Sequence, residues 1–276
     1  MAIPLRDDAP TRRTPWVTWA LILINIVTFL FLQPAFFQSG RADREQISSN
    51  DIAEARKARR YLYTWGAIPC EVEHGKPLAR ITGGSGCELG FTARSALLPE
   101  HKSPWLALLT SIFLHGSLSH LAGNMLFLWV FGNNVEDRLG HVVYLLFYLV
   151  GGVVATMGHV VFNGSSIQPV VGASGAIAAV MGAYFVFKPR GRILTAVVTA
   201  AFQVVYIPAF VVLGLFFVTQ FFTPTSSNVA WEAHAVGMGA GVLAALLLAR
   251  VFPDPDRQRP DTAGAVPAPD VGPYRG

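Results

Sequence analysis

A short glycine-rich turn carries the serine that is best placed for chemistry. Gly172-Ala173-Ser174-Gly175 stands at the head of an apolar run that continues to Phe187. A Gly-x-Ser-Gly turn exposes a serine hydroxyl beside backbone N–H groups, and nucleophilic acyl transfer needs both an accessible Oγ and donors for the oxyanion. The four-residue pattern alone is weak, because a small residue at the start of a packed transmembrane helix looks the same.

A second copy of the pattern occurs earlier in the chain. Gly83-Gly84-Ser85-Gly86 lies in a polar, glycine-rich stretch with no apolar run after it. We interpret this copy as a loop, since nothing in the neighbouring sequence would hold its serine in a fixed position.

Three further residues become candidates once the apolar segments are placed in a membrane. Ser174 begins one segment, His234 lies near the start of another, and His120 and Asn124 lie in the first turns of a third. All three segments are predicted to run inward, so these residues share one depth just below the outer surface. His120 and Asn124 are four residues apart and therefore share a helix face. Ionisable residues inside transmembrane segments are rare and usually mark function.

Small residues predict that the serine and histidine segments approach each other closely. Gly175, Ala179 and Ala183 recur at spacing four in one segment, and Gly237 and Gly241 do so in the other. Small residues at this spacing let two helix backbones come together, as a hydrogen bond between the two functional side chains requires. Ordinary helix packing explains the same rows, so they fit both interpretations.

Together these residues predict a serine–histidine dyad. His234 would take the proton from Ser174, which attacks a peptide carbonyl. The oxyanion would be held by His120, Asn124 and the backbone N–H of the serine. Glu232 is two residues from the histidine and is expected to face elsewhere. No third, orienting carboxylate is therefore predicted.

Composition indicates a membrane protein. Of the 276 residues, 52% are hydrophobic and 14% are charged, whereas soluble domains carry about 25% charged residues. The net charge of +4 is expected for cationic cytoplasmic flanks and needs no nucleic-acid partner. No zinc-like cysteine spacing occurs, and we predict neither a metal nor a cofactor. Cys70 and Cys87 share one polar segment, where a disulfide and two free thiols are both open alternatives.

The predicted fold class is an all-α membrane protein, a six-transmembrane-helix bundle. It has a large extracytoplasmic first loop at about 39–116. Within that loop, residues 104–114 are apolar but too short to span, and we interpret them as re-entrant or interfacial. The six spans are expected at about 16–37, 117–135, 140–162, 173–187, 205–222 and 231–252.

Basic residues predict the orientation of the bundle. Arg12, Lys188 and Arg250 mark cytoplasmic ends of spans, which places both termini in the cytoplasm. The active site would then open toward the extracytoplasmic side. Glu136, Asp137 and Arg138 are expected to form a short inner loop. Outside the bundle domain, 16–252, we expect a disordered N-terminus and a disordered C-terminal tail, residues 1–15 and 253–276.

Other polar and aromatic residues receive structural interpretations. His115 is expected to be interfacial or structural, and His159 to form a hydrogen bond with a neighbouring helix. The aromatic residues of the fifth span are lipid-facing or packing residues, or they form a lateral gate: Phe216, Phe217, Phe221 and Phe222.

Three motifs of the chain form a recognisable set. They are His120-x-x-x-Asn124 with Gly132, Glu136 and Gly140, then Gly172-Ala173-Ser174-Gly175, then Ala233-His234 with Gly237 and Gly241. With these motifs the chain resembles the rhomboid family of intramembrane serine proteases from about residue 16 to residue 252. The resemblance implies a six-helix bundle, a Ser174–His234 dyad, an oxyanion site of His120 and Asn124, and no cofactor. It also implies cleavage of single-span membrane proteins near the outer face.

Two positions depart from the family pattern. Some members carry a Trp-Arg pair in the first outer loop, where this chain reads Trp105-Leu106-Ala107. An aromatic residue four positions after the serine often stacks on the catalytic histidine, and here that position is Ala178. The sequence therefore leaves open how His234 is held.

We accordingly predict an intramembrane serine endopeptidase of a bacterial plasma membrane. Its partners would be single-span transmembrane substrates and the lipid bilayer. An inactive rhomboid-like protein that binds or escorts membrane clients is the alternative, and loss of Ser174 or His234 would favour it, but both are present. A transporter would need polar residues along a whole path, whereas the polar residues here cluster at one depth.

Overall fold

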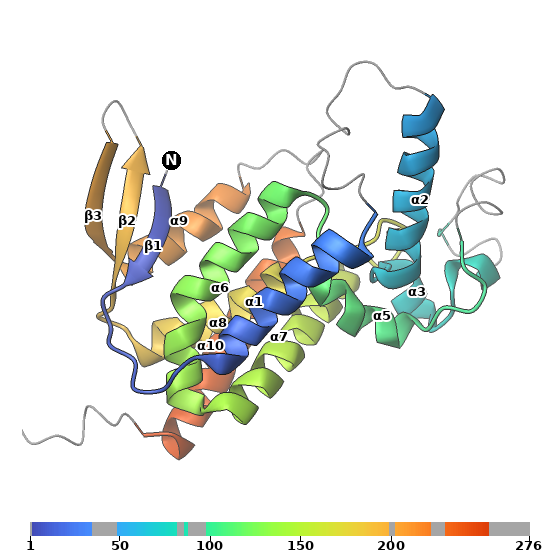
Figure 1. The fold of residues 1–276 in the computed structure, drawn as a ribbon. Helices are drawn as coiled ribbons and strands as arrows, with labels where there is room; N and C mark the ends of the chain where they lie inside the picture. The colour runs from blue at the N-terminus through green and yellow to red at the C-terminus, as the bar shows by residue number, and fades with distance from the viewer. Residues whose placement is uncertain are drawn as a thin grey trace, which may run out of the picture.

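The computed structural model describes residues 2–34, 49–81, 86–87, 98–198, 202–221 and 230–253, and most of them are helical (Figure 1). The turn with Ser85 and the tail from residue 254 lie outside the described residues. In chain order the elements are β1 (Ala2–Asp7), α1 (Trp16–Val27), the π-helical turn η1 (Thr28–Leu32), α2 (Ser49–Trp65), α3 (Pro69–His74), η4 (Leu78–Arg80), α5 (Pro104–Thr110), η5 (Ser111–Phe113), α6 (Leu118–Leu139), α7 (His141–Phe162), α8 (Ser174–Phe187), β2 (Arg192–Val198), β3 (Phe202–Pro208), α9 (Ala209–Phe221) and α10 (Trp231–Val251).

Helix α8 is the centre of the bundle. It contacts α10, α7 and α6, and these helices surround it in Figure 1. Every residue from 175 to 184 is buried. The helix carries no charged residue and is apolar on all sides, which is the pattern of a helix enclosed by others. Its position fixes Ser174, which is its first residue.

Helices α8 and α10 pack backbone against backbone. A Cβ atom on Gly237 would lie 2.5 Å from the carbonyl oxygen of Gly175, and one on Gly241 would overlap the backbone of Ala179. A Cβ on Gly182 would likewise overlap the backbone of Met238. Side chains at these positions would push the helices apart. The small residues therefore allow the backbones of α8 and α10 to approach closely.

A three-stranded antiparallel sheet in the order β1-β2-β3 corrects the expected all-α fold. Strand β1 pairs with β2 from Ala2↔Val197 to Asp7↔Ile193, so residues 2–7 of the expected disordered N-terminus are ordered. The expected fifth span also begins too early, since α9 starts only at Ala209. The residues before it are rich in β-branched side chains, which favour strands, and Pro208 disfavours a helix immediately before it.

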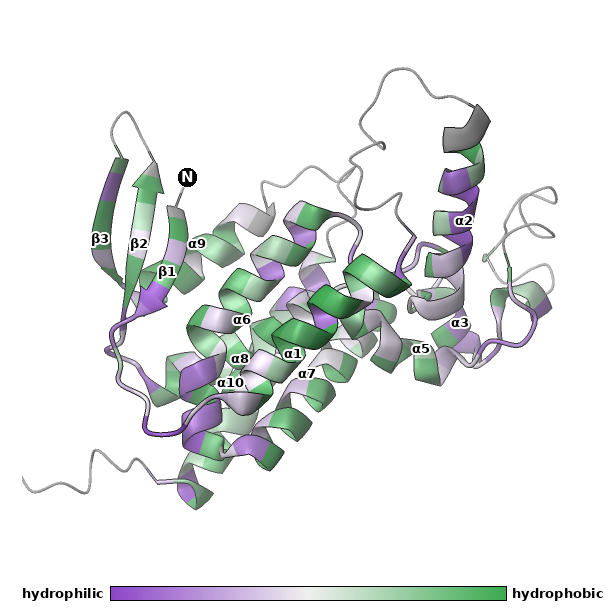
Figure 2. Cartoon of the chain, viewed as in Figure 1, coloured by the Kyte–Doolittle hydropathy of each residue, from purple (hydrophilic) through white to green (hydrophobic). Residues whose placement is uncertain are grey.

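In the part of the chain that the structure describes, two helices, α7 and α10, are long and apolar enough to cross a membrane. A third crossing results if α5 with η5 is joined to α6, although the chain bends by 81° between them. Three further segments are apolar but shorter, namely Trp16–Leu32, α8 and Ala209–Thr219. Figure 2 shows hydrophobic residues over the bundle helices and mostly hydrophilic residues on α2. The count of six spans stays a prediction.

The polar segment between α1 and α5 contains a small folded unit, which we call the cap and define as residues 49–81 with 86–87. A disulfide joins Cys70 to Cys87, which settles the alternative that the sequence left open. Lys102 Nζ, which is buried, lies 2.6 Å from Glu71 Oε2 and donates to the carbonyl oxygens of Tyr63 and Gly66. Burial lowers the pKa of Lys102, and the Glu71 carboxylate acts in the opposite direction.

The cap is attached to the chain that leads into α8. Ala67 and Val170 form an isolated antiparallel bridge, and the backbone N–H of Cys70 donates to the carbonyl oxygen of Ser166 at 3.0 Å. These bonds order the residues just before Gly172. The cap therefore helps to position the turn that carries the serine.

Candidate active site

The serine and histidine side chains meet at the start of their two helices. Ser174 Oγ lies 2.7 Å from His234 Nε2, within hydrogen-bond distance. Ser174 is the first residue of α8, and His234 lies in the first turn of α10 with 6% of its surface exposed. For the hydroxyl to donate, Nε2 must be the ring nitrogen without a proton. The pair then has the arrangement of a nucleophile and its general base.

His120 and Asn124 face the turn that precedes the serine. Ser117 caps α6 by accepting from the backbone N–H of His120 at 3.1 Å, which begins the helix at the point that presents both side chains. A Cβ on Gly172 would lie 2.9 Å from His120 Nε2 and 3.7 Å from Asn124 Nδ2. Gly172 also has φ +128°, so only glycine suits this position.

Asn124 has a buried amide donor that the protein does not use. Its Nδ2 has no hydrogen-bond partner among the described residues, although only 8% of the side chain is exposed. Leaving a buried donor unpaired costs about 1–3 kcal/mol. Such a cost is typical of a group reserved for a ligand or a reaction intermediate.

The N-terminus of α8 supplies backbone donors at the same place. An α-helix leaves the N–H groups of its first turn without intrahelical acceptors, and no side chain caps this end of α8. The first intrahelical bond here runs from Ile177 N to Ala173 O. The N–H of Ser174 is therefore among the donors that lie at the positive end of the helix dipole.

Phe216 takes the place of the aromatic residue that position 178 lacks. Its ring on α9 lies 5.8 Å from the His234 ring, centroid to centroid, with a 50° tilt, and it also packs against Phe127 at 5.1 Å. The sequence analysis interprets four phenylalanines of this segment as packing residues or a gate. Their spacing does not indicate which of them contacts His234. His115, which is fully buried, similarly packs its ring edge-on against His120 at 5.1 Å.

A cavity of about 1000 Å³ contains the whole arrangement. Its lining includes all four candidate residues, Ser174, His234, His120 and Asn124. Its apolar walls include Phe127 and Phe216, and its polar walls include Ser117 and Gln168 from segments outside the central helices. It is large enough for a stretch of peptide and for water, whose share of liquid volume is about 30 Å³.

Glu232 and His159 form a second polar contact on the cavity wall. His159 Nδ1 lies 3.2 Å from Glu232 Oε2, so α7 is bonded to α10, as expected for His159. The side chains of the pair are 13% and 16% exposed. Glu232 thus has a partner other than His234, in keeping with its position two residues away.

Gly132, Glu136 and Gly140 lie toward the C-terminal end of α6 and are not among the residues that line the cavity. The expected inner loop is wrong, because Glu136, Asp137 and Arg138 all lie in the last turn of α6. The Glu136 carboxylate accepts from the backbone N–H groups of Val17 and Thr18 at 2.9 and 2.7 Å and lies 2.6 Å from His141 Nδ1. Gly140 ends the helix with φ +76°, and a Cβ on Gly132 would lie 2.6 Å from the Tyr144 hydroxyl.

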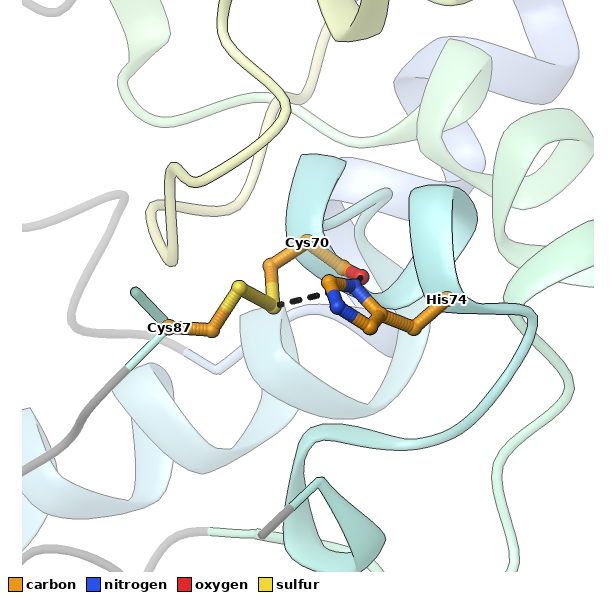
Figure 3. Close-up of side chains that lie close together, drawn as sticks. All are labelled: Cys70, His74 and Cys87. Carbon is orange, nitrogen blue, oxygen red and sulfur yellow. Dashed lines mark hydrogen bonds between the residues drawn. A yellow bond between two sulfur atoms is a disulfide. The ribbon is translucent and has the colours of Figure 1, made fainter. Parts of the chain in front are cut away.

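One group of metal-ligating residue types occurs among the described residues. Cys70, His74 and Cys87 lie together in the cap (Figure 3). The two sulfur atoms are joined in a disulfide, and His74 Nδ1 bonds the carbonyl oxygen of Cys70 at 2.9 Å. Metal ions bind cysteine as the thiolate, so this group does not fit a metal while the disulfide is intact.

Comparison with known proteins agrees with these motifs. The rhomboid domain family matches residues 102–251. The rhomboid protease GluP of Bacillus subtilis (strain 168) is 35% identical over 176 residues, which cover 62% of this chain and 32% of GluP. The presenilin-associated rhomboid-like protein A, mitochondrial, of Danio rerio is 34% identical over 97 residues, 34% of this chain and 25% of that protein.

A shorter relative matches over most of its length. The putative rhomboid protease YdcA of Bacillus subtilis (strain 168) is 30% identical over 144 residues, 52% of this chain and 67% of YdcA. By contrast, this chain matches a third or less of GluP and of the Danio rerio protein. The family match alone covers more than half of the chain and includes His120, Asn124, Ser174 and His234. The chain is therefore a member of the rhomboid family.

Proposed function

We propose that this protein is an intramembrane serine endopeptidase with Ser174 as nucleophile and His234 as general base. The observation that carries the proposal is the 2.7 Å contact between Ser174 Oγ and His234 Nε2 inside a large cavity. The unused donor of Asn124 on the same cavity supports a place for an oxyanion. The protease names of two bacterial relatives point in the same direction.

The proposed reaction proceeds through an acyl-enzyme. Ser174 Oγ attacks the carbonyl carbon of the substrate while its proton passes to His234 Nε2. The resulting oxyanion accepts hydrogen bonds from Asn124, His120 and the backbone N–H of Ser174. The C–N bond then breaks as His234 gives the proton to the leaving amine.

Water completes the cycle. His234 takes a proton from a water molecule in the cavity, and the hydroxide attacks the acyl carbon. The bond to Ser174 Oγ breaks, and the serine takes the proton back from His234. Phe216 and the buried ring environment would keep the imidazole in its orientation during both proton transfers.

We further propose a topology of six spans with both termini in the cytoplasm. Helices α7 and α10 would provide two crossings, α6 a third, and the shorter apolar helices α1, α8 and α9 the others. Arg12, Lys188 and Arg250 flank the ends of apolar helices, as expected for cytoplasmic ends. The cavity would then open toward the extracytoplasmic side of a bacterial plasma membrane.

The substrate would be a single-span membrane protein that unwinds near the outer end of its helix. A peptide in a regular helix has its carbonyl groups bonded and shielded, so Ser174 could not reach the carbonyl carbon. Gly or Pro weakens a helix by about 1 or 3 kcal/mol relative to Ala. Such residues in the outer part of the substrate span would make cleavage easier.

The test combines active-site labelling with cleavage. The purified full chain in liposomes, and its Ser174→Ala variant, would be treated with a fluorophosphonate and separately mixed with a single-span substrate. We expect labelling and cleavage by the parent, both absent in the variant. A Ser85→Ala variant should retain both activities. Cleavage that survives Ser174→Ala and needs Ser85 would overturn the assignment. Binding of membrane proteins without labelling or cleavage would favour an inactive escort protein.

A further inference from the structure

Glu232 gives the cavity a single acidic position. Among the described residues that line the cavity, Glu232 is the one with an Asp, Glu, Lys or Arg side chain. The other polar side-chain groups on these walls are hydroxyl, amide, imidazole and indole groups. The Glu232 side chain is 16% exposed, so it is neither withdrawn into the protein nor freely solvated. A substrate in the cavity therefore meets one carboxylate and no cationic side chain from these residues except a protonated histidine.

The Glu232 carboxylate is held by a contact with a neighbouring helix. His159 Nδ1 lies 3.2 Å from Glu232 Oε2, and Asn163 Nδ2 lies 3.3 Å from the same His159 nitrogen. A carboxylate can accept about four hydrogen bonds, so the contact with His159 leaves capacity for a group on the substrate. A held carboxylate also loses less conformational entropy on binding than a mobile one.

The same helix turn presents Glu232 and the catalytic base. Glu232 precedes His234 by two residues in the first turn of α10, and both residues line the cavity. A peptide held against the dyad therefore places side chains near the carboxylate. Because the cavity wall has a lower dielectric constant than water, a charge pair there is stronger than the same pair on an open surface.

We propose that Glu232 selects substrates with a basic residue, Lys or Arg, close to the cleaved bond. This inference rests on the proposed protease function and specifies its substrate class. The ammonium or guanidinium group would donate to the Glu232 carboxylate while Ser174 attacks the nearby carbonyl. An acidic residue at the same substrate position would be repelled. Glu232 is thus a specificity residue and takes no part in the proton transfers.

The experiment is a charge scan of a cleaved single-span substrate. In liposomes, each position flanking the cleaved bond is changed in turn to Lys, Gln and Glu, and kcat/KM is measured for each. For the parent enzyme we expect one position at which Lys is preferred over Gln by about tenfold, between the values for exposed and buried charge pairs. Glu at that position should be cleaved more slowly than Gln.

Variants of the enzyme assign the preference to one side chain. Glu232→Gln keeps an acceptor for His159 but removes the charge, so the Lys-to-Gln ratio should fall to about one. Glu232→Lys should invert the preference toward Glu. Glu73→Gln, an exposed acidic residue of the cap outside the cavity lining, should leave the ratio at the parental value.

The outcomes separate this inference from the function on which it rests. A parent enzyme with no charge preference at any position, or a Lys preference that persists in Glu232→Gln, would overturn the role of Glu232 while leaving the protease intact. Absence of any cleavage that depends on Ser174 would overturn the proposed function itself. A general loss of rate in Glu232→Gln with an unchanged Lys-to-Gln ratio would assign Glu232 a bracing role between α7 and α10, against the inference.

Discussion

Two buried polar side chains of α6, Asn124 and Glu136, differ in whether the fold pairs them. Asn124, near the start of the helix, has a buried Nδ2 with no partner among the described residues. Glu136, twelve residues later, is also buried, but its carboxylate accepts from Val17 N, Thr18 N and Thr18 Oγ1 and bonds His141. At 1.5 Å per residue the two lie about 18 Å apart along one helix.

We call the Asn124 end of α6 the proposed reactive end and the Glu136 end the structural end. Glu136 takes the role of an N-cap for α1, whose own cap residue, Pro15, makes no side-chain bond. Its bonds are complete within the fold, so they contribute to stability. By contrast, Asn124 Nδ2 has no hydrogen-bond partner among the described residues, and the first N–H groups of α8 have no intrahelical acceptors. A reaction intermediate would pair with Asn124, so this residue would contribute to the rate of the reaction.

The largest expected effect is at the reactive end. Ser174→Ala and His234→Ala should each lower kcat/KM by roughly 10⁴–10⁶. The double variant should be no slower than the slower single variant, because the two side chains act as one unit. Cleavage of a single-span substrate in liposomes measures the rates, and thermal unfolding in detergent should be close to the parent for all three. Losses that multiply in the double variant would contradict a dyad.

Glu136→Ala should give the largest loss of stability. Removing one member of a buried charged network costs about 3–5 kcal/mol, and here it also leaves two backbone donors of α1 unpaired. The neighbouring Asp137 is the control, because it accepts from the backbone N–H groups of Arg12 and Arg13 at a more exposed site. Asp137→Ala should cost about 1 kcal/mol or less. Denaturant unfolding in micelles measures the loss of stability in both variants. Equal losses would contradict the special role of Glu136.

Asn124→Ala should affect rate without loss of stability. Loss of one oxyanion donor slows turnover by roughly 10²–10³, with His120 and the Ser174 N–H still in place. The temperature of unfolding should be unchanged or slightly higher, since an unpaired buried donor has been removed. Kinetics and thermal unfolding on the same preparation test both parts. A destabilised enzyme with normal turnover would show that Asn124 stabilises the fold and does not act in the reaction.

The smallest effect concerns Asp7 at the structural end, where its Oδ2 accepts from Asn134 Nδ2 and the Tyr184 hydroxyl. Burial raises the pKa of Asp7 from 3.8 to about 6. Between pH 4 and 6 the folded protein then binds more protons than the unfolded chain, so this group makes stability fall as pH rises, by no more than about 3 kcal/mol. Above about pH 6 its contribution is constant.

The matched variant is Asp7→Asn, whose Oδ1 can accept both bonds because both end on one oxygen. The free energy of unfolding, measured between pH 4 and 8, should fall from pH 4 to 6 in the parent. The variant should lack the part of this fall that Asp7 causes. Parallel pH curves for the two proteins would show that Asp7 titrates normally.

Hydropathy predicted the helices that are apolar along their whole length. The starts expected at residues 117, 140, 173 and 231 agree within one residue with α6, α7, α8 and α10. A long apolar run between polar flanks depends on no distant partner, so local sequence suffices to find it. The four candidate residues share one cavity because each lies at a helix start, which the same pattern locates.

Features that depend on distant partners were not predicted. Strand β1 is ordered by pairing with β2, and no hydrophobic periodicity in residues 1–15 indicates that pairing. Glu136 was expected in a loop because charge usually marks helix ends, whereas its four bonds come from other elements. Phe216 could be found only from the contact between α9 and α10, since neighbouring phenylalanines offer the same chemistry.

The pairing of β1 with β2 also constrains how often the chain crosses the bilayer. An open sheet edge is not tolerated in hydrocarbon, so in the proposed topology all three strands would lie outside it. Strands β1 and β2 are hydrogen-bonded, so they would share one side of the membrane. The number of crossings between Asp8 and Gly191 would consequently be even. If α1, α6, α7 and α8 each cross, then α5 with η5 must enter and leave by the same face.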